Sequence, residues 1–337
     1  MKKYILVFLV VLLNLPLIAK DKITDESTPS LKAGYFNCEK FEADGIWYEH
    51  YISETREIKV KVIASQGQKY SGDIVIPENV SDNRFTYTVG KIGPQTFYGC
   101  TGLTSISIPN SVTSIEWDAF DGCENLKRVY ISDIAAWCSI CFNSNNPLLC
   151  NSECRLFLNG EEVQGDLVIP DSVTVINQGA FYGCSKLTSI TIPNSITRID
   201  INTFYGCTNL KRVYISDFDA WCLIDLGDNP LMSNSECRLF LNGEEIHGNF
   251  VIPSTVTTIK YGAFYNCSKI SSLTIPNSVT KIEDYAFYGC AGLTSIKIPN
   301  SVTVLGWNSF RDCVGLTSID IPNSVISIDS SAFKNCI

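Results

Sequence analysis

Cysteine is the residue type with which this 337-residue chain could do the most chemistry. A thiol can form a disulfide, bind a metal or act as a nucleophile, and the chain has 15 cysteines. Eight of them recur in runs with a spacing of 23 residues: Cys100 and Cys123; Cys184 and Cys207; Cys267, Cys290, Cys313 and Cys336. The odd total and the even spacing do not fit a disulfide framework. We expect these eight to be free thiols that act as small hydrophobic groups inside a repeated unit.

The other seven cysteines leave two interpretations open. They are Cys38, Cys138, Cys141, Cys150, Cys154, Cys222 and Cys237. Cys138 could form a disulfide with Cys154, and Cys222 with Cys237, or each thiol could pack its segment against a neighbouring unit. Cys138 and Cys141 form a Cys-x-x-Cys pair, but a second copy of this segment has Asp225 in place of the latter. A redox function for this pair is therefore weakly supported.

Other catalytic chemistry has few candidates in the sequence. The two histidines, His50 and His247, have no partner at metal-ligand spacing, so neither a zinc site nor histidine-based catalysis is expected. The glutamate pairs at 161–162 and 244–245 follow Asn-Gly turns, where exposed carboxylates make poor general acids. We assign no catalytic residue, no metal and no cofactor, and expect no enzyme. The net charge of −9 argues against a nucleic-acid or anionic-membrane partner, which would need a basic surface.

Binding is the chemistry that the remaining residues suggest. Arginine, tyrosine and tryptophan are the residue types enriched at interface hot spots. The candidate binding residues are Arg128, Tyr130, Arg212, Tyr214, Trp117 and Trp307. The alternative for the Arg-Tyr pairs is that the adjoining inserts shield them and that the pairs only support those inserts. The alternative for the tryptophans is that they cover the convex side of the repeats and stack on their neighbours.

The elements that position these residues are repeats. The unit at 268–290 reads SKISSLTIPNSVTKIEDYAFYGC, and the next two units match it in register, with prolines at Pro253, Pro276, Pro299 and Pro322. A period in the low twenties is typical of leucine-rich solenoids, in which each coil depends on its neighbours for burial. In the LTSISIP phrase, Ile106 and Ile108 alternate with serines, as expected of a strand with one buried face.

Stacked coils place such strands side by side in a parallel sheet. Ten strand phrases can be counted, around Ile76, Ile108, Ile131, Ile169, Ile192, Ile215, Ile252, Ile275, Ile298 and Ile321. The sequence therefore predicts a β-rich repeat solenoid whose parallel sheet has about ten short strands. The cysteine ladder falls in the coil interior.

Two inserts interrupt the repeats, at about 133–165 and 217–248, and a larger duplication with a period near 83 residues relates them. Asp133 and Asp217 stand where an N-cap would begin a short helix carrying Trp137 or Trp221. Each insert continues with an RLFLNGEE phrase, which reads as a hairpin turned by Asn-Gly. We expect each insert to project from the solenoid as a helix and a hairpin.

The chain divides into three regions. Residues 1–19, with a basic start, an apolar run and a small residue at Ala19, fit a secretory signal peptide, and the alternative is a membrane anchor. The stretch from Tyr4 to Ile18 has 15 residues and is broken by Asn14 and Pro16, which is short for a bilayer span, so we expect cleavage and no membrane span in the mature chain. Residues 20–71 form a β-rich capping segment, and residues 72–337 form the solenoid.

The phrases LTSIxIPNSVTxIxxxAFxGC and NLKRVYISDxxAWC…NPL…LFLNGEE resemble the BspA-type, or Treponema pallidum-type, leucine-rich repeat family of bacterial secreted and surface proteins. The resemblance extends from about Gly72 to the end. It implies a secreted or cell-surface protein that binds a protein or glycoprotein, with an adhesion role toward host matrix or other cells. One alternative is end-to-end assembly through a C-terminal coil that has no polar cap. A further alternative is a carbohydrate-binding module.

Overall fold

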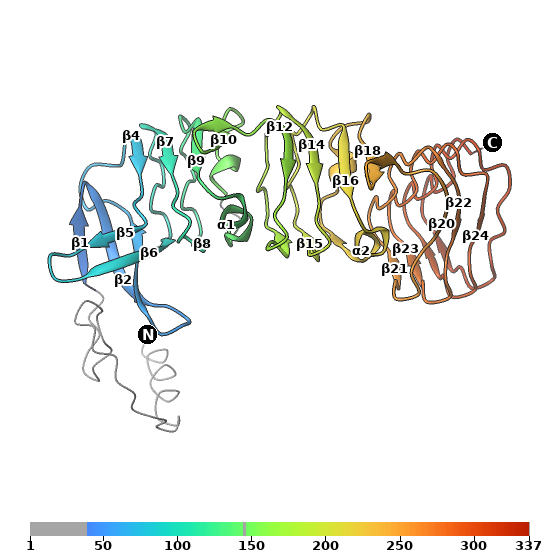
Figure 1. Cartoon of the computed structure of the whole chain (residues 1–337), viewed down its shortest axis with the longest axis horizontal. Coiled ribbons are helices and arrows are strands. Elements are labelled where there is room, and N and C mark those ends of the chain that lie inside the picture. The colour runs from blue at the N-terminus through green and yellow to red at the C-terminus, as the bar shows by residue number, and fades with distance from the viewer. Residues whose placement is uncertain (1–38, 144–145, 337) are drawn as a thin grey trace, which may run out of the picture.

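The computed structural model describes residues 39–143 and 146–336. The predicted signal peptide and Cys38 lie outside these residues. The chain forms an elongated solenoid, with a small mixed sheet at the N-terminal end and stacked coils beyond it (Figure 1). The predicted fold class, a β-rich repeat solenoid with short helix and hairpin inserts, is confirmed.

The N-terminal sheet is built from strands β1 (Lys40–Ala43), β2 (Ile46–Ile52) and β3 (Ile58–Ile63), which pair antiparallel. β3 then pairs parallel with β6 (Thr86–Ile92), and β5 (Asn79–Ser81) pairs antiparallel with β6. Apolar residues alternate along these strands, and Tyr48, Val60 and Val89 are almost completely buried. The sheet therefore continues past residue 71 into the first turn of the repeats.

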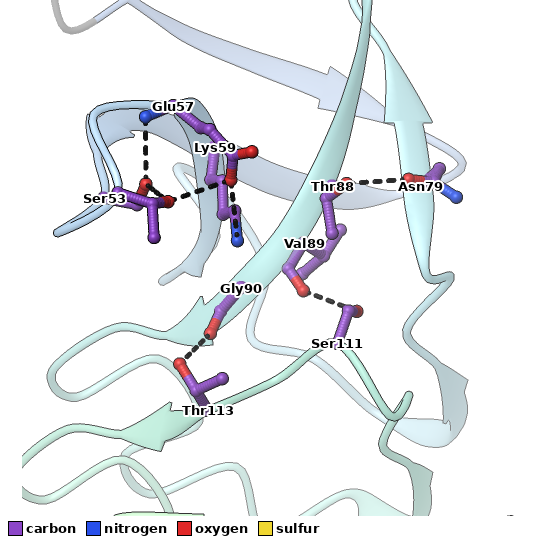
Figure 2. A network of polar contacts seen from close by, with 10 residues as sticks. Ser53, Glu57, Lys59, Asn79, Thr88, Val89, Gly90, Ser111 and Thr113 are labelled. Atoms are coloured by element: carbon purple, nitrogen blue, oxygen red, sulfur yellow. Dashed lines mark hydrogen bonds and ion pairs between the residues drawn. The ribbon is translucent and has the colours of Figure 1, made fainter. Parts of the chain in front are cut away.

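Side-chain hydrogen bonds join this sheet to the first complete coil (Figure 2). Ser111 Oγ donates to the carbonyl oxygen of Val89 at 2.7 Å, and Thr113 Oγ1 donates to that of Gly90 at 3.3 Å. Corresponding serines make the same bond between later coils, as Ser278 does to Val256. β6 thus takes the place of a preceding coil, and the N-terminal sheet covers that end of the solenoid.

Each regular coil has a longer strand, a short strand and a tight Phe-containing turn. In the first complete coil these are β7 (Leu103–Ser107), β8 (Ser114–Ile115) and the turn around Phe120. Leu103, Ile106 and Ile115 have no exposed surface, because the alternating apolar side chains of the strands point into the coil. Burying a side chain of this size contributes roughly 1.5–3 kcal/mol.

The longer strands form three parallel sheets instead of a continuous one. The first consists of β4 (Gly72–Val75), β7, β9 (Arg128–Ile131), β10 (Arg155–Leu158) and the antiparallel β11 (Glu161–Glu162). The second consists of β12 (Gly165–Val168), β14 (Leu187–Thr191), β16 (Arg212–Ile215), β18 (Arg238–Leu241) and β19 (Glu244–Glu245). The third consists of β20 (Gly248–Val251), β22 (Ile270–Thr274) and β24 (Ser295–Lys297). We call residues 72–164, 165–247 and 248–336 the first, second and third segments.

The short strands form separate ladders along the other side of the coils (Figure 1). One ladder is β13 (Val175–Ile176), β15 (Arg198–Ile199) and β17 (Asp225–Leu226). The next is β21 (Thr258–Ile259), β23 (Lys281–Ile282), β25 (Val304–Leu305) and β26 (Ser327–Ile328). Nine of the ten expected longer strands form, and the phrase around Ile321 does not.

Phenylalanine rings and thiols fill the space between stacked coils. Phe264 stacks on Phe287, Phe287 on Phe310 and Phe310 on Phe333, with ring centroids 5.1–5.4 Å apart. The thiol of Cys290 donates to the carbonyl oxygen of Phe264 in the preceding coil at 3.1 Å. Cys123, Cys207, Cys313 and Cys336 make the same bond one coil back. The repeated cysteines therefore hold consecutive coils together as hydrogen-bond donors as well as apolar fillers.

The expectation that the inserts project from the solenoid is wrong. Their helices, α1 (Ile134–Ser139) and α2 (Phe218–Leu223), form as predicted, with Asp133 and Asp217 as N-caps. Single turns of 3-10 helix follow at η1 (Pro147–Leu149) and η2 (Pro230–Met232). However, the first strand of each predicted hairpin pairs parallel with the preceding long strand, β10 with β9 and β18 with β16. Each insert is thus an enlarged coil of the solenoid.

The insert tryptophans explain why these coils stay within the stack. The side chain of Trp137 is 1% exposed, and its Nε1 donates to the carbonyl oxygen of Ala180 in the next segment at 2.8 Å. Trp221 makes the same bond to Ala263 at 3.0 Å. A buried indole needs a partner for its N–H, and here the partner lies across the junction between segments. The tryptophans therefore join the segments where the longer strands do not pair.

Candidate binding surface on the longer strands

The outward side chains of the longer strands form two rows, which we call the long-strand face. In the first segment, Asp73, Ser105, Arg128 and Arg155 are in register in one row. Val75, Ser107, Tyr130 and Phe157 are in register in the other row. The strand register thus places the predicted residues Arg128 and Tyr130 next to each other on one surface, as expected for alternate residues of a strand.

A carboxylate positions the arginine in this first patch. Asp73 Oδ1 accepts hydrogen bonds from Ser105 Oγ at 2.6 Å and Thr104 Oγ1 at 2.8 Å, and lies 3.8 Å from an Arg128 guanidinium nitrogen. The hydrogen bonds from Ser105 and Thr104, with a smaller contribution from the arginine charge, lower the pKa of Asp73. The side chain of Arg128 remains 46% exposed. It is therefore oriented by the strand face and open to a partner.

The second segment repeats the arrangement with the same residue types. Asp166 Oδ1 accepts from Ser189 Oγ at 2.5 Å and from Thr188 Oγ1 at 3.2 Å, and lies 3.5 Å from Arg212. The hydrogen bond from Ser189 is the main cause of the lowered pKa of Asp166. Arg212 is 44% exposed, close to the value for Arg128. The equivalence in residue type, register and contact makes this a duplicated site.

Each patch contains an aromatic residue that the sequence analysis missed. Phe157, on β10, lies 5.0 Å from Tyr130 between ring centroids, and Phe240, on β18, lies 5.1 Å from Tyr214. The signal was present in the sequence, because RLFL has the same Arg, apolar, aromatic, apolar order as RVYI. The inserts therefore extend the face with a second ring. They do not cover the arginine.

The third segment lacks the site at the same register. The row that holds Asp, Ser and Arg in the first two segments holds Asn249, Ser272 and Ser295 here. The position of the tyrosine is occupied by Lys297. All three segments keep an exposed valine at the end of their first strand, namely Val75, Val168 and Val251, which are 63–67% exposed. The third segment thus offers a natural reference surface that has the fold and the valine without the Arg-Tyr-Phe group.

The two predicted tryptophans lie elsewhere. Trp117 and Trp307 follow short strands, so the structure does not bring them to the long-strand face. Trp117 is 54% exposed and Trp307 is 42% exposed. The ring of Trp307 contacts that of Tyr285, with centroids 5.0 Å apart. The two rings meet edge to face, so Trp307 packs against its neighbour Tyr285 and does not stack on it.

The described residues contain no disulfide. Fourteen of the cysteines are free thiols, including both candidate pairs, Cys138 with Cys154 and Cys222 with Cys237. The neighbouring side chain of Cys154, together with burial, raises the pKa of the Cys150 thiol, which donates to the carbonyl oxygen of Pro147 at 2.8 Å. Burial raises the pKa of the Cys123, Cys184 and Cys313 thiols to about 12. Thiols that stay protonated in this way are poor nucleophiles.

The described part of the chain contains neither a cluster of metal ligands nor a membrane-spanning helix. Within residues 39–143 and 146–336, no three His, Cys, Asp or Glu side chains gather as ion ligands. The helices in this part of the chain are also too short to cross a bilayer. A shallow open depression lies beside Arg128, lined by Thr101, Gly102, Thr104, Asn125 and Lys127.

These coils, ladders and strand registers define a leucine-rich repeat solenoid. The chain belongs to the BspA-type leucine-rich repeat family, because six copies of that family's repeat region match residues 77–151, 155–221 and 238–337. No curated protein matches the chain.

Solved structures of bacterial leucine-rich repeat proteins are similar to the chain. A leucine-rich cell surface protein from Faecalibacterium prausnitzii is 24% identical, with 89% of this chain and 87% of that one covered and a TM-score of 0.47. The pneumococcal vaccine antigen PcpA is 18% identical, with coverage of 89% and 80% and a TM-score of 0.44. A leucine-rich repeat protein from Bacteroides ovatus is 24% identical, with coverage of 88% and 92% and a TM-score of 0.34.

Proposed function

We propose that this protein is a secreted or cell-surface adhesion protein that binds a protein or glycoprotein of the host matrix or of another cell, without catalysis. Membership of the BspA-type family supports a protein-binding repeat protein. The signal-like residues 1–19 support export of the chain. The observation that carries the proposal is the duplicated patch, which has Arg128, Tyr130 and Phe157 in one segment and the same residue types in the next.

The composition and geometry of the patch suit recognition of a protein surface. Arginine and tyrosine dominate interface hot spots, and an arginine that is already held in place loses less side-chain entropy on binding. Arg128 is held by Asp73, and Arg212 by Asp166. Each arginine stands beside a half-buried aromatic pair that offers apolar area. A partner carboxylate would pair with the arginine while an apolar side chain covers the rings.

The spacing of the two patches adds a second contribution. The patches occupy two successive sheets of the solenoid, the first on β9 and β10 and the second on β16 and β18. Two linked contacts can raise apparent affinity by a factor of about 10² to 10⁴ over one. A ligand with repeated epitopes would therefore bind through both patches at once.

The test is capture of immobilised host matrix proteins and cell-surface glycans by the mature protein. The variant Arg128→Ala, Tyr130→Ala, Arg212→Ala, Tyr214→Ala is expected to lose capture. The matched control is Ser295→Ala, Lys297→Ala, which alters the same two rows in the third segment and is expected to bind normally. Unchanged capture by the fourfold variant would refute the proposed face, and capture of glycans alone would favour the carbohydrate-binding alternative.

A second candidate function is assembly between copies through the last described coil. Ile326 is 83% exposed there, and Ile321 and Ile328 are 42% and 47% exposed, whereas the equivalents of the latter two in the preceding coil, Ile298 and Leu305, are buried. An apolar surface of this kind gains free energy when a second copy covers it. Light scattering over a range of concentrations tests this proposal. A strictly monomeric mature protein would remove it.

A further inference from the structure

A cluster of five aromatic rings lies on the short-strand side of the third segment, away from the duplicated patch. Its members are Tyr261, Tyr265, Tyr285, Tyr288 and Trp307. Tyr285 is the hub, with ring centroids 5.0 Å from Trp307, 5.7 Å from Tyr261 and 5.8 Å from Tyr288. Tyr265 stacks on Tyr288 at 4.8 Å. The tyrosines are half-buried and Trp307 is exposed, so the cluster forms part of the surface.

The backbone of the hub residue is strained. Each coil has a residue with positive φ directly before its Phe-containing turn, and most coils place Asn, Asp or Gly there, as in Asp118, Asn202, Gly262 and Asn308. Those types adopt the left-handed region most readily. Tyr285 has φ of 57° at this position, where a bulky side chain is an outlier. Backbone strain of this kind clusters at binding and active sites, and the strained Tyr285 is the residue that contacts all four of the other rings.

Carboxylates surround the cluster. Asp284 Oδ1 accepts the backbone N–H of Trp307 at 2.9 Å, and Glu283 Oε2 accepts that of Tyr261 at 3.1 Å. Burial, and after it the nearby carboxylate of Asp312, raise the pKa of Tyr288. Lys281 lies 3.5 Å from Glu283, and Arg311 lies 3.5 Å from Asp312. Within the described residues, Glu283 and Asp312 thus each have a basic partner, whereas Asp284 has no ion-pair partner, so its carboxylate complements a positively charged ligand.

The chain itself shows how a cation sits on these rings. The guanidinium carbon of Arg311 lies 5.7 Å from the centroid of Tyr288, within the range of a cation-π interaction. The same side chain pairs with Asp312 beside the ring. Ring and carboxylate together thus hold a guanidinium group. Tyr285, Trp307 and Asp284 offer the same two components next to it.

We propose that this aromatic cluster is a second binding site, which takes an arginine- or lysine-rich segment of a partner protein. The site is independent of the duplicated patch, because it lies in the segment that lacks the Arg-Tyr-Phe group and on the other side of the coils. Basic side chains of the partner would lie over Tyr285 and Trp307 and pair with Asp284.

The probe is a fluorescein-labelled peptide of four Arg-Gly units, with a peptide of four Glu-Gly units as the charge control. Fluorescence anisotropy with the mature protein in low salt is expected to show binding of the first peptide only. Tyr285→Asn, which introduces the residue that other coils use at this position, is expected to weaken binding at least tenfold while leaving the melting temperature equal or higher. Trp307→Ala is expected to weaken binding similarly.

The controls separate this site from general charge attraction. Trp117→Ala removes an exposed tryptophan from the first segment and is expected to bind the peptide normally. The fourfold variant of the duplicated patch is also expected to bind it normally, so failure of one proposal leaves the other standing. Equal binding by Tyr285→Asn and wild type would overturn the proposal. Binding of a neutral oligosaccharide such as maltoheptaose in place of the basic peptide would overturn it as well.

Discussion

Replacing Trp137 tests how the insert coils join the segments. Its indole is 1% exposed, packs against Phe142 with ring centroids 5.0 Å apart, and donates to Ala180 of the next segment. Trp137→Ala removes both the packing and the hydrogen bond, and large-to-small changes of this kind cost about 3–5 kcal/mol. Trp137→Phe keeps most of the packing and leaves the Ala180 carbonyl oxygen without its donor, which costs about 1–3 kcal/mol.

The assay is urea unfolding followed by far-ultraviolet circular dichroism at 25 °C. In a solenoid, stability is approximately a sum of coil and interface contributions, so a weakened junction should also let the first and second segments unfold separately. The matched control is Trp117→Phe, which alters a tryptophan that is 54% exposed and should stay within about 0.5 kcal/mol of wild type. If Trp137→Phe also stayed within that range, the indole bond would not join the segments.

Three further predictions concern the thiols and a helix cap. Iodoacetamide at pH 8 should label the exposed Cys141 and leave the buried Cys290 unreacted until urea is added, and a non-reduced peptide linking Cys290 to another ladder cysteine would contradict free thiols. Burial raises the pKa of Cys184 to about 12, so the folded chain keeps this thiol protonated after the unfolded chain has released the proton. The free energy of unfolding should therefore fall as pH rises. For an unfolded pKa of about 8.5, the loss at pH 10 is about 2 kcal/mol for each such thiol. A free energy of unfolding that stays constant between pH 8 and pH 11 would count against this. Asp133 Oδ1 accepts the N–H groups of Ala135 and Ala136, so Asp133→Ala should cost about 1 kcal/mol in the same urea assay, and no change would show that the cap is dispensable.

Regular repeats made most of the fold predictable from the sequence. Ile106 and Ile108 alternate with serines in a period of 2, and the 23-residue register carries this pattern from coil to coil. The N-caps Asp133 and Asp217 and the Asn-Gly turns of the hairpins were equally predictable, since each depends on local residues only. Local signals of this kind fix secondary structure within a few residues.

The inserts were mispredicted because their role depends on distant partners. The RLFL phrase was interpreted as the first strand of a projecting hairpin, and nothing local indicates that β10 pairs parallel with β9. The carbonyl oxygen that receives the Trp137 indole N–H belongs to Ala180, 43 residues along the chain. Contacts across a junction between segments follow from the stacking of coils, so a single insert read alone cannot reveal them.

The candidate site was predictable only in part, because some of its contacts also join residues that are far apart in the sequence. Arg128 and Tyr130 could be placed on one face from strand alternation alone. Asp73 could not, because it lies two coils before Arg128. Phe157 was missed because the RLFL phrase was assigned to a projecting hairpin, although it has the same order of residue types as RVYI. Tyr285 was also missed as the hub of a cluster, since its significance lies in a backbone conformation that its equivalents Asn308 and Asp118 share.

Hydroxyl-radical footprinting of the mature protein with a captured partner tests the binding face most directly. Oxidation of exposed side chains is read by mass spectrometry in the free protein and in the complex. The proposal predicts protection of Tyr130, Phe157, Tyr214 and Phe240. Tyr98 and Tyr205 lie in the Phe-containing turns and are 48% and 64% exposed, so they should stay equally reactive. Protection of those two tyrosines with unchanged reactivity of the four predicted residues would contradict the account.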